Sequence, residues 1–201
     1  EVVRENKNIN ILSDEIYELI LKKEFKHLSL ASLAPDLKER IFIINGFAKG
    51  WAMTGWRVGY LVGQKDVIRA SSALQSQSTS NVCSFVQRGA LEALKINQEF
   101  FLKINSHYDL RREVLYKGLK NIEGLFIHPP NGAFYAFPRL PNNSITSVEF
   151  CKKILNDYGL VVVPGKPFGD DQCFRISCAS SKEKILDGLS RLKKGISNYY
   201  F

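Results

Sequence analysis

The stretch from Asn45 to Gly63 constrains the fold most strongly, because it places one lysine between two apolar, β-favouring runs. Residues 41–44 (Ile-Phe-Ile-Ile) precede it and residues 58–62 form its apolar end, and such runs are typical of buried strands. Lys49 is therefore predicted to lie on a glycine-containing connection between two buried strands, with Arg57 eight positions later. A lone lysine in such a place usually reaches water past its apolar neighbours, so the surrounding residues decide whether Lys49 has another role.

The composition fits a soluble protein of one domain or two small ones. The 201 residues are 45% hydrophobic and 24% charged, with a net charge of +8. Basic residues are spread from Arg4 to Lys194 and cluster only in pairs, which argues against a nucleic-acid partner. A ligand carrying phosphate and carboxylate groups would account for part of the basic excess.

The cysteines and the apolar runs predict a cytosolic protein with free, buried thiols. Four cysteines and three histidines show no C-x-x-C pair and no metal-like spacing. No run approaches the roughly 18 apolar residues of a membrane span, and residues 1–7 do not resemble a signal peptide. The chain has no initiating methionine and its first residues resemble the end of an amphipathic helix, so we expect a fragment.

The first part of the chain has the pattern of an α/β sheet. A short strand at residues 9–12 leads to Asp14, residues 22–40 are expected to be loop, and residues 64–77 have helical spacing. A long helical region is predicted from Asn81 to Leu119, with a bend near Asn97, and it could connect two domains.

The second part has an α+β pattern. Strands are predicted around residues 125–127, 133–137, 160–163 and 173–178, and a helix over 147–158 that Gly159 ends. Ser180 and Glu183 have capping-box spacing and are expected to start the terminal helix. We place the domain boundary between residues 105 and 106.

Lys49 and nearby polar residues are suited to aldehyde chemistry. An uncharged lysine amine forms a Schiff base with a carbonyl group, and apolar neighbours or a nearby cation favour the uncharged amine. An aldehyde cofactor with a phosphate, a ring nitrogen and a phenolic oxygen would also need a cation, an acid and a hydrogen-bond donor. Arg57, Asp14 and Tyr17 are of these types, although Asp14 taken alone is better interpreted as a helix N-cap.

Several segments resemble the class I aminotransferases, most closely the bacterial type of aspartate aminotransferase. They occur in the family's order with similar gaps over nearly the whole chain. The resemblance implies an α/β fold: the C-terminal part of a fold type I pyridoxal phosphate-dependent large domain at residues 1–105, followed by an α+β small domain at 106–201. The segments are S-D-E-I-Y (13–17), N-G-F-A-K (45–49), A-M-T-G-W-R-V-G-Y (52–60), P-N-G-A-F-Y (130–135), V-P-G (163–165) and F-R-I-S (174–177).

Carried over by position, the resemblance implies a role for each of five residues. Lys49 would hold pyridoxal 5'-phosphate as a Schiff base and transfer the substrate proton. Asp14 would pair with the ring nitrogen, Tyr17 with the phenolic oxygen and Arg57 with the phosphate. Arg175 would bind the substrate α-carboxylate, although alone it would be interpreted as a surface salt-bridge residue.

Three functions remain open at this stage. The first is a homodimeric transaminase acting on an amino acid, expected to be aspartate or glutamate, and a 2-oxo acid. The second is an aminotransferase-like ligand-sensing module of a transcriptional regulator, and the third is a β-lyase or synthase. Because the family's N-terminal half supplies the other side of the pocket, we expect this fragment alone to be inactive.

Overall fold

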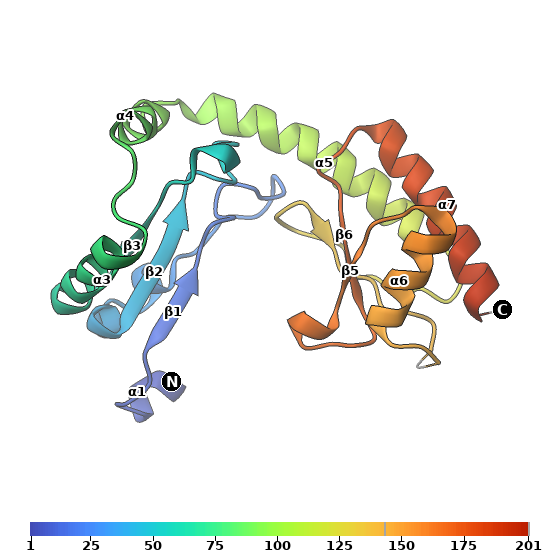
Figure 1. Ribbon diagram of the computed structural model, residues 1–201, viewed down its shortest axis with the longest axis horizontal. Coiled ribbons are helices and arrows are strands. Elements are labelled where there is room, and N and C mark those ends of the chain that lie inside the picture. The colour runs from blue at the N-terminus through green and yellow to red at the C-terminus, as the bar shows by residue number, and fades with distance from the viewer. Residues whose placement is uncertain (143, 201) are drawn as a thin grey trace. The chain divides into compact units, whose positions relative to one another are not determined.

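Two small sheets organise the chain, one in each of its two compact units (Figure 1). The computed structural model describes residues 1–142 and 144–200. The first unit is Glu1–Leu102 and the second unit is Lys103–Phe201. Assigning them to the large and the small domain of the aminotransferase fold stays a prediction.

The sheet of the first unit has the strand order β1-β2-β3 (Figure 1). Strand β1 (Ile11–Asp14) runs parallel to β2 (Ile41–Gly46), and β3 (Gly59–Val62) runs antiparallel to β2. Asp14 pairs with Ile44, and Gly46 pairs with Gly59. The carboxyl ends of β1 and β2 and the amino end of β3 therefore meet at one edge of the sheet.

The prediction that both strands around the Lys49 connection are buried is wrong for β3. Ile41 in β2 is buried, but Tyr60 and Val62 of β3 are 42% and 52% exposed, and Leu12 of β1 is 65% exposed. These apolar side chains are therefore only partly covered, although the Tyr60 ring contacts that of Phe47. The sequence pattern reports the apolar character of a strand and not the presence of a covering layer.

The remaining elements of the first unit are helical. Residues 22–40 are not all loop, because α2 and a 3₁₀-helix form there, and the long helical region is two separate helices, with a turn before Gln98 where the bend was expected. None of the helices among residues 1–142 and 144–200 is long and apolar enough to cross a membrane. The elements are α1 (Val2–Glu5), α2 (Leu30–Leu33), η1 (Pro35–Arg40), η2 (Thr54–Trp56), α3 (Lys65–Ser78), α4 (Ser84–Ala93) and α5 (Gln98–Lys120), which continues into the second unit.

The second unit has an antiparallel sheet of order β4-β6-β5 and an apolar core. Phe150, Ile154, Phe174 and Leu192 are completely buried in that core. These residues come from two helices and the central strand, so the core joins both layers. The elements are β4 (Tyr135–Ala136), α6 (Ser147–Tyr158), β5 (Val163–Pro164), η3 (Lys166–Phe168), β6 (Phe174–Ser177) and α7 (Lys182–Tyr200).

Helix α6 has the start and stop signals of a stable helix. Thr146 and Glu149 form a reciprocal capping box, and Gly159 ends the helix in the left-handed conformation at φ 61°, as predicted. The capping box predicted for α7 from Ser180 and Glu183 is wrong, because Lys182 starts the helix and Lys184 stands three residues after Ser181, where a box needs a glutamate or glutamine. The Ser181 hydroxyl, not that of Ser180, accepts from a backbone N–H, that of Lys184 at 3.4 Å.

Candidate active site

Four of the five predicted site residues lie at the same edge of the first sheet. Asp14 is the last residue of β1, Lys49 follows the carboxyl end of β2, and Arg57 lies two residues before the amino end of β3. Tyr17 is in the turn after β1. Ligands of open α/β sheets bind at the carboxyl ends of strands, so this edge is the candidate site.

Backbone hydrogen bonds and one indole hold the connection that carries Lys49. The Ala52 N–H donates to the Lys49 carbonyl at 3.1 Å, and the Met53 N–H donates to the Phe47 carbonyl at 3.1 Å. The Trp51 Nε1–H donates to the Ala93 carbonyl of α4 at 3.0 Å. Phe47 and Met53 are buried against α4. This packing holds the backbone on either side of Lys49.

Gly46 is required because β2 and β3 approach each other closely where the connection begins. A Cβ atom at Gly46 would lie 2.7 Å from the Gly59 Cα and 2.9 Å from the Val58 carbonyl oxygen. Both of these are backbone atoms, which cannot move aside as a flexible side chain can. Glycine is therefore the residue that fits at position 46, and no side chain there can contact a ligand.

Asp14 and Tyr17 are presented by a tight turn after β1. The Asp14 Oδ1 accepts the N–H of Ile16 at 3.2 Å, which is a turn contact. The interpretation of Asp14 as a helix N-cap is wrong, since residues 16–19 form turns and no helix. The Nζ of half-buried Lys49 lies 5.6 Å from the centroid of the Tyr17 ring, so these two residues, far apart in sequence, are brought together.

Arg57 is exposed and has a strained backbone. Its φ of 53° is in the left-handed region, which costs a residue with a Cβ about 1–2 kcal/mol. Its Nη1 donates to the Thr54 carbonyl at 2.8 Å. Ala52, on the same connection, also has a positive φ, 55°. Strained residues held by their surroundings are enriched at functional sites.

Arg175 belongs to the second unit and lies between two aromatic rings. Its guanidinium carbon is 4.3 Å from the Tyr135 ring centroid and 4.7 Å from that of Phe168. No carboxylate of the described residues forms an ion pair with it, so its interpretation as a surface salt-bridge residue is wrong. The cation–π contacts with the two rings restrict the orientation of the guanidinium.

The turn that leads to Tyr135 has its own buried anchor. Arg112 of α5, 3% exposed, pairs with Asp109 at 2.7 Å and donates to the carbonyl of Ala133 at 2.5 Å. Ala133 has a φ of 52°, so this hydrogen bond holds a strained residue. Arg112 therefore also supports β4, the strand that carries Tyr135, one of the two rings in contact with Arg175.

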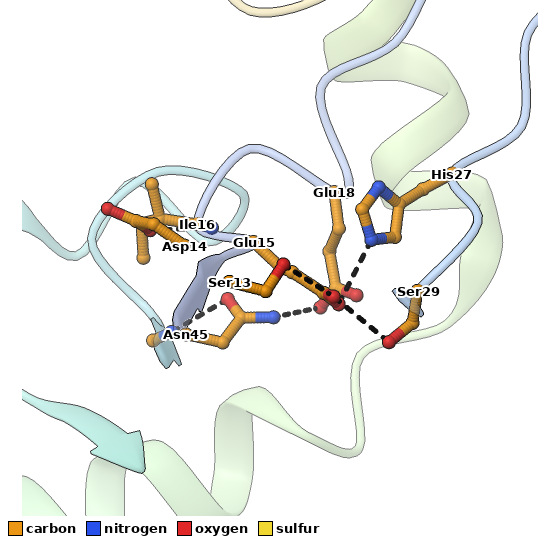
Figure 2. Close-up of polar contacts among 9 residues, drawn as sticks. Ser13, Asp14, Glu15, Ile16, Glu18, His27, Ser29 and Asn45 are labelled. Atoms are coloured by element: carbon orange, nitrogen blue, oxygen red, sulfur yellow. Dashed lines mark hydrogen bonds and ion pairs between the residues drawn. The ribbon is translucent and has the colours of Figure 1, made fainter. Parts of the chain in front are cut away.

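Sequence reasoning missed a polar network beside Asp14 and Tyr17. Glu15, Glu18, His27 and Asn45 belong to three segments, and no local pattern connects them (Figure 2). A local signal is that Glu15 lies in the resembling segment 13–17 and that Glu18 directly follows it. The sequence does not show that Glu15 is buried.

Comparison with known proteins identifies the family. The family model described as "Aminotransferase class I and II" matches residues 1–192. The chain belongs to this family. It is 38% identical to the probable aspartate/prephenate aminotransferase of Rickettsia typhi, an alignment that covers 96% of this chain and 51% of that protein. It is 36% identical to the aspartate aminotransferase of Pyrococcus horikoshii, with 96% and 50% covered.

Solved structures of the family confirm the predicted α/β, fold type I architecture. The aspartate aminotransferase of Rhizobium meliloti matches with a TM-score of 0.90 and 34% identity, covering 98% of this chain and 51% of that one. The aromatic aminotransferase of Pyrococcus horikoshii matches with a TM-score of 0.89 and 33% identity, covering 98% and 53%. The chain therefore spans about half the length of the relatives it matches.

Proposed function

We propose that the protein to which this chain belongs transfers amino groups between an amino acid and a 2-oxo acid, with pyridoxal 5'-phosphate held at Lys49. The observation that carries the proposal is the meeting of Asp14, Tyr17, Lys49 and Arg57 at one sheet edge in a member of the aminotransferase family. Enzymes of this family use pyridoxal phosphate.

The residues at this edge fit the cofactor by their chemistry. An aldehyde needs an amine, which Lys49 supplies. A phosphate needs a cation, and the exposed Arg57, whose backbone is in the left-handed conformation, supplies it. A protonated ring nitrogen needs a carboxylate, and a phenolic oxygen needs a donor; Asp14 and Tyr17 are the matching groups, next to each other in one turn. When bound, the cofactor supplies an electron sink for the bond broken at the substrate Cα.

The protein groups then have separate tasks. The Nζ of Lys49 moves the proton from the substrate Cα, a step that needs an amine able to gain and lose a proton near neutral pH. The Asp14 carboxylate keeps the ring nitrogen protonated, and the Tyr17 hydroxyl donates a hydrogen bond. Arg175, oriented by Tyr135 and Phe168, binds the α-carboxylate as a bidentate fork.

We infer that the residues that select the amino donor lie in the half of the fold that this chain does not span. Relatives named for aspartate and for aromatic substrates match the chain almost equally, with TM-scores of 0.90 and 0.89. Aspartate or glutamate remains our proposal from the curated relatives, several of which are named aspartate aminotransferases. A homodimer, a cytosolic location and inactivity of this segment alone are also proposals.

The experiment that tests the function is spectroscopic. Full-length protein incubated with pyridoxal phosphate is expected to show the visible absorption of lysine-bound cofactor, and Lys49→Ala is expected to lose it. Lys95→Ala is the matched control, because Lys95 lies in the same unit and pairs with Glu92 at the surface. An unchanged spectrum in Lys49→Ala would refute the assignment. Addition of an amino acid should bleach the wild-type band and a 2-oxo acid should restore it.

A further inference from the structure

A buried carboxylate with no task in the proposed reaction lies between Asp14 and Tyr17. The Glu15 side chain is 4% exposed, and a carboxylate is almost never buried unless it is paired. Its Oε1 accepts from the hydroxyls of Ser13 at 3.1 Å and Ser29 at 3.0 Å, and its Oε2 lies 3.0 Å from the Nε2 of His27 (Figure 2). Burial raises the pKa of Glu15, but the hydrogen bonds from His27, Ser29 and Ser13 outweigh it and hold the pKa below its ordinary value. Glu15 is therefore ionised at neutral pH.

The same turn has a second anchor on the other side of Tyr17. The Glu18 Oε1 accepts from the Nδ2 of Asn45 at 2.7 Å, and the Asn45 Oδ1 accepts the Gly46 N–H at 2.7 Å. Asn45 is 4% exposed and is the last but one residue of β2, four residues before Lys49. The network thus ties the turn that carries Tyr17 to the strand that leads to Lys49.

The hydrogen-bonded network of Glu15, Glu18, His27 and Asn45 is better explained as a structural support of the turn than as a metal site. One donor atom from each of Glu15, Glu18 and His27 lies within 4.8 Å of the other two. Each of these side chains already has a protein partner: Ser13, Ser29 and His27 on Glu15, and Asn45 on Glu18. Two nearby carboxylates repel each other, and the imidazole and the amide offset that repulsion without an ion.

The direction of the side chains divides the turn into two faces. In Figure 2, Asp14 points away from the Glu15 cluster, while His27, Ser29 and Ser13 converge on it. Asp14 and Glu15 are adjacent at the end of a strand, where successive side chains alternate. Fixing Glu15 on the inner face therefore fixes the direction of Asp14 on the other.

We propose that Glu15 is a positioning residue for Asp14 and Tyr17, acting through His27, Ser29 and the Glu18–Asn45 pair. This inference rests on the proposed function, because the groups that it positions are the proposed cofactor ligands. Glu15 does not touch the cofactor; it sets the place of the turn relative to Lys49. Removing the charge of Glu15 leaves Lys49 in place and makes the positions of Asp14 and Tyr17 less well defined.

The test compares full-length wild-type protein with Glu15→Gln, which keeps the shape and removes the charge. In cofactor-free protein, amide hydrogen exchange of the peptide covering residues 13–20 is expected to speed up at least about tenfold, as for the loss of a buried charge-assisted hydrogen bond. With pyridoxal phosphate, the dissociation constant should rise about tenfold and the pH midpoint of the visible absorption should shift. Glu92→Gln is the control, since Glu92 is 71% exposed and forms a surface ion pair with Lys95.

A milder variant keeps the test decisive if Glu15→Gln fails to fold. Ser29→Ala removes one donor to Glu15 and should give a smaller change of the same kind in exchange and in the absorption midpoint. If these measurements equal the wild type in both variants while Lys49→Ala still loses the absorption, the positioning role is wrong and the proposed function stands. If the wild type itself shows no lysine-bound cofactor, the proposed function fails, and this inference fails with it.

Discussion

Two glycines of α7 allow a quantitative test of the packing that supports the Arg175 sheet. Gly188 and Gly195 are both buried in the helix, and alanine is favoured over glycine in a helix by roughly 0.5–1 kcal/mol. At Gly188 an added Cβ would lie 3.4 Å from the nearest atom, Leu160 Cδ1, which is ordinary contact. Gly188→Ala should therefore raise the free energy of unfolding by roughly 0.5–1 kcal/mol.

The same change at Gly195 meets the core. The added Cβ would lie 2.1 Å from the Cδ1 of Ile154, a residue of α6 with 0% exposure. That methyl group must move within a packed interior, and overpacking of this kind costs roughly 1–3 kcal/mol. Because the helix-propensity gain is common to both variants, Gly195→Ala should be less stable than Gly188→Ala by that full amount.

A double-mutant cycle isolates the contact. Ile154→Val removes Cδ1 and alone should cost roughly 0.5–1.5 kcal/mol. In the Gly195→Ala background the same change also relieves the clash, so the coupling energy should be at least about 1 kcal/mol and favourable.

Urea unfolding followed by circular dichroism gives the energies. Fluorescence of Trp51 and Trp56, both in the first unit, checks that the first unit is unchanged. Equal stabilities of the two alanine variants, or additive effects in the cycle, would refute the packing argument.

Two further predictions concern Arg175 and the thiols. Arg175→Ala should lower kcat/KM by about 10–100-fold for every amino donor alike, because a charge-assisted hydrogen bond contributes roughly 1.5–3 kcal/mol and all donors share the α-carboxylate; loss for one side chain alone would contradict this role. Cys83 is exposed, so the prediction of buried thiols is wrong for it and holds for Cys151, Cys173 and Cys178. At pH 8, iodoacetamide should label Cys83 in native protein and spare the other three, because burial raises the pKa of each of those three from 9.0 to about 11. Thiols of the unfolded chain lose their protons at a lower pH than the buried thiols of the native protein. The free energy of unfolding should therefore fall as pH rises from about 9 towards 11. Equal labelling of all four native thiols, counted by mass spectrometry, would contradict the burial of the three cysteines.

Local signals in the sequence predicted several elements well. The range of α6 and its end at Gly159 agree with the structure, because the cap and the helix-ending glycine act within one turn. Strand β2 also begins where its β-favouring run begins, at Ile41. Such features depend on neighbours along the chain, which the sequence shows directly.

Contacts between distant segments were not predicted. Asn45 meets Glu18 across 27 positions and Ser29 meets Glu15 across 14, and no periodicity encodes either pair. The two rings around Arg175 were also missed, since Phe168 comes from η3 and Tyr135 from β4. The type of a residue indicates what it can bond, but only the fold decides which partner it has.

The packing of the first unit explains why its strands are exposed while the Lys49 connection is held. A buried cluster formed by Phe47, Met53, Ala90 and Ala93 joins the connection to α4, whereas Leu12 of β1 and Val62 of β3 are exposed. Ala52 and Arg57 have left-handed backbones there, a conformation that persists only where the surroundings over-determine it. Apolar burial in this unit therefore stabilises a strained loop at the sheet edge, and that loop presents the lysine.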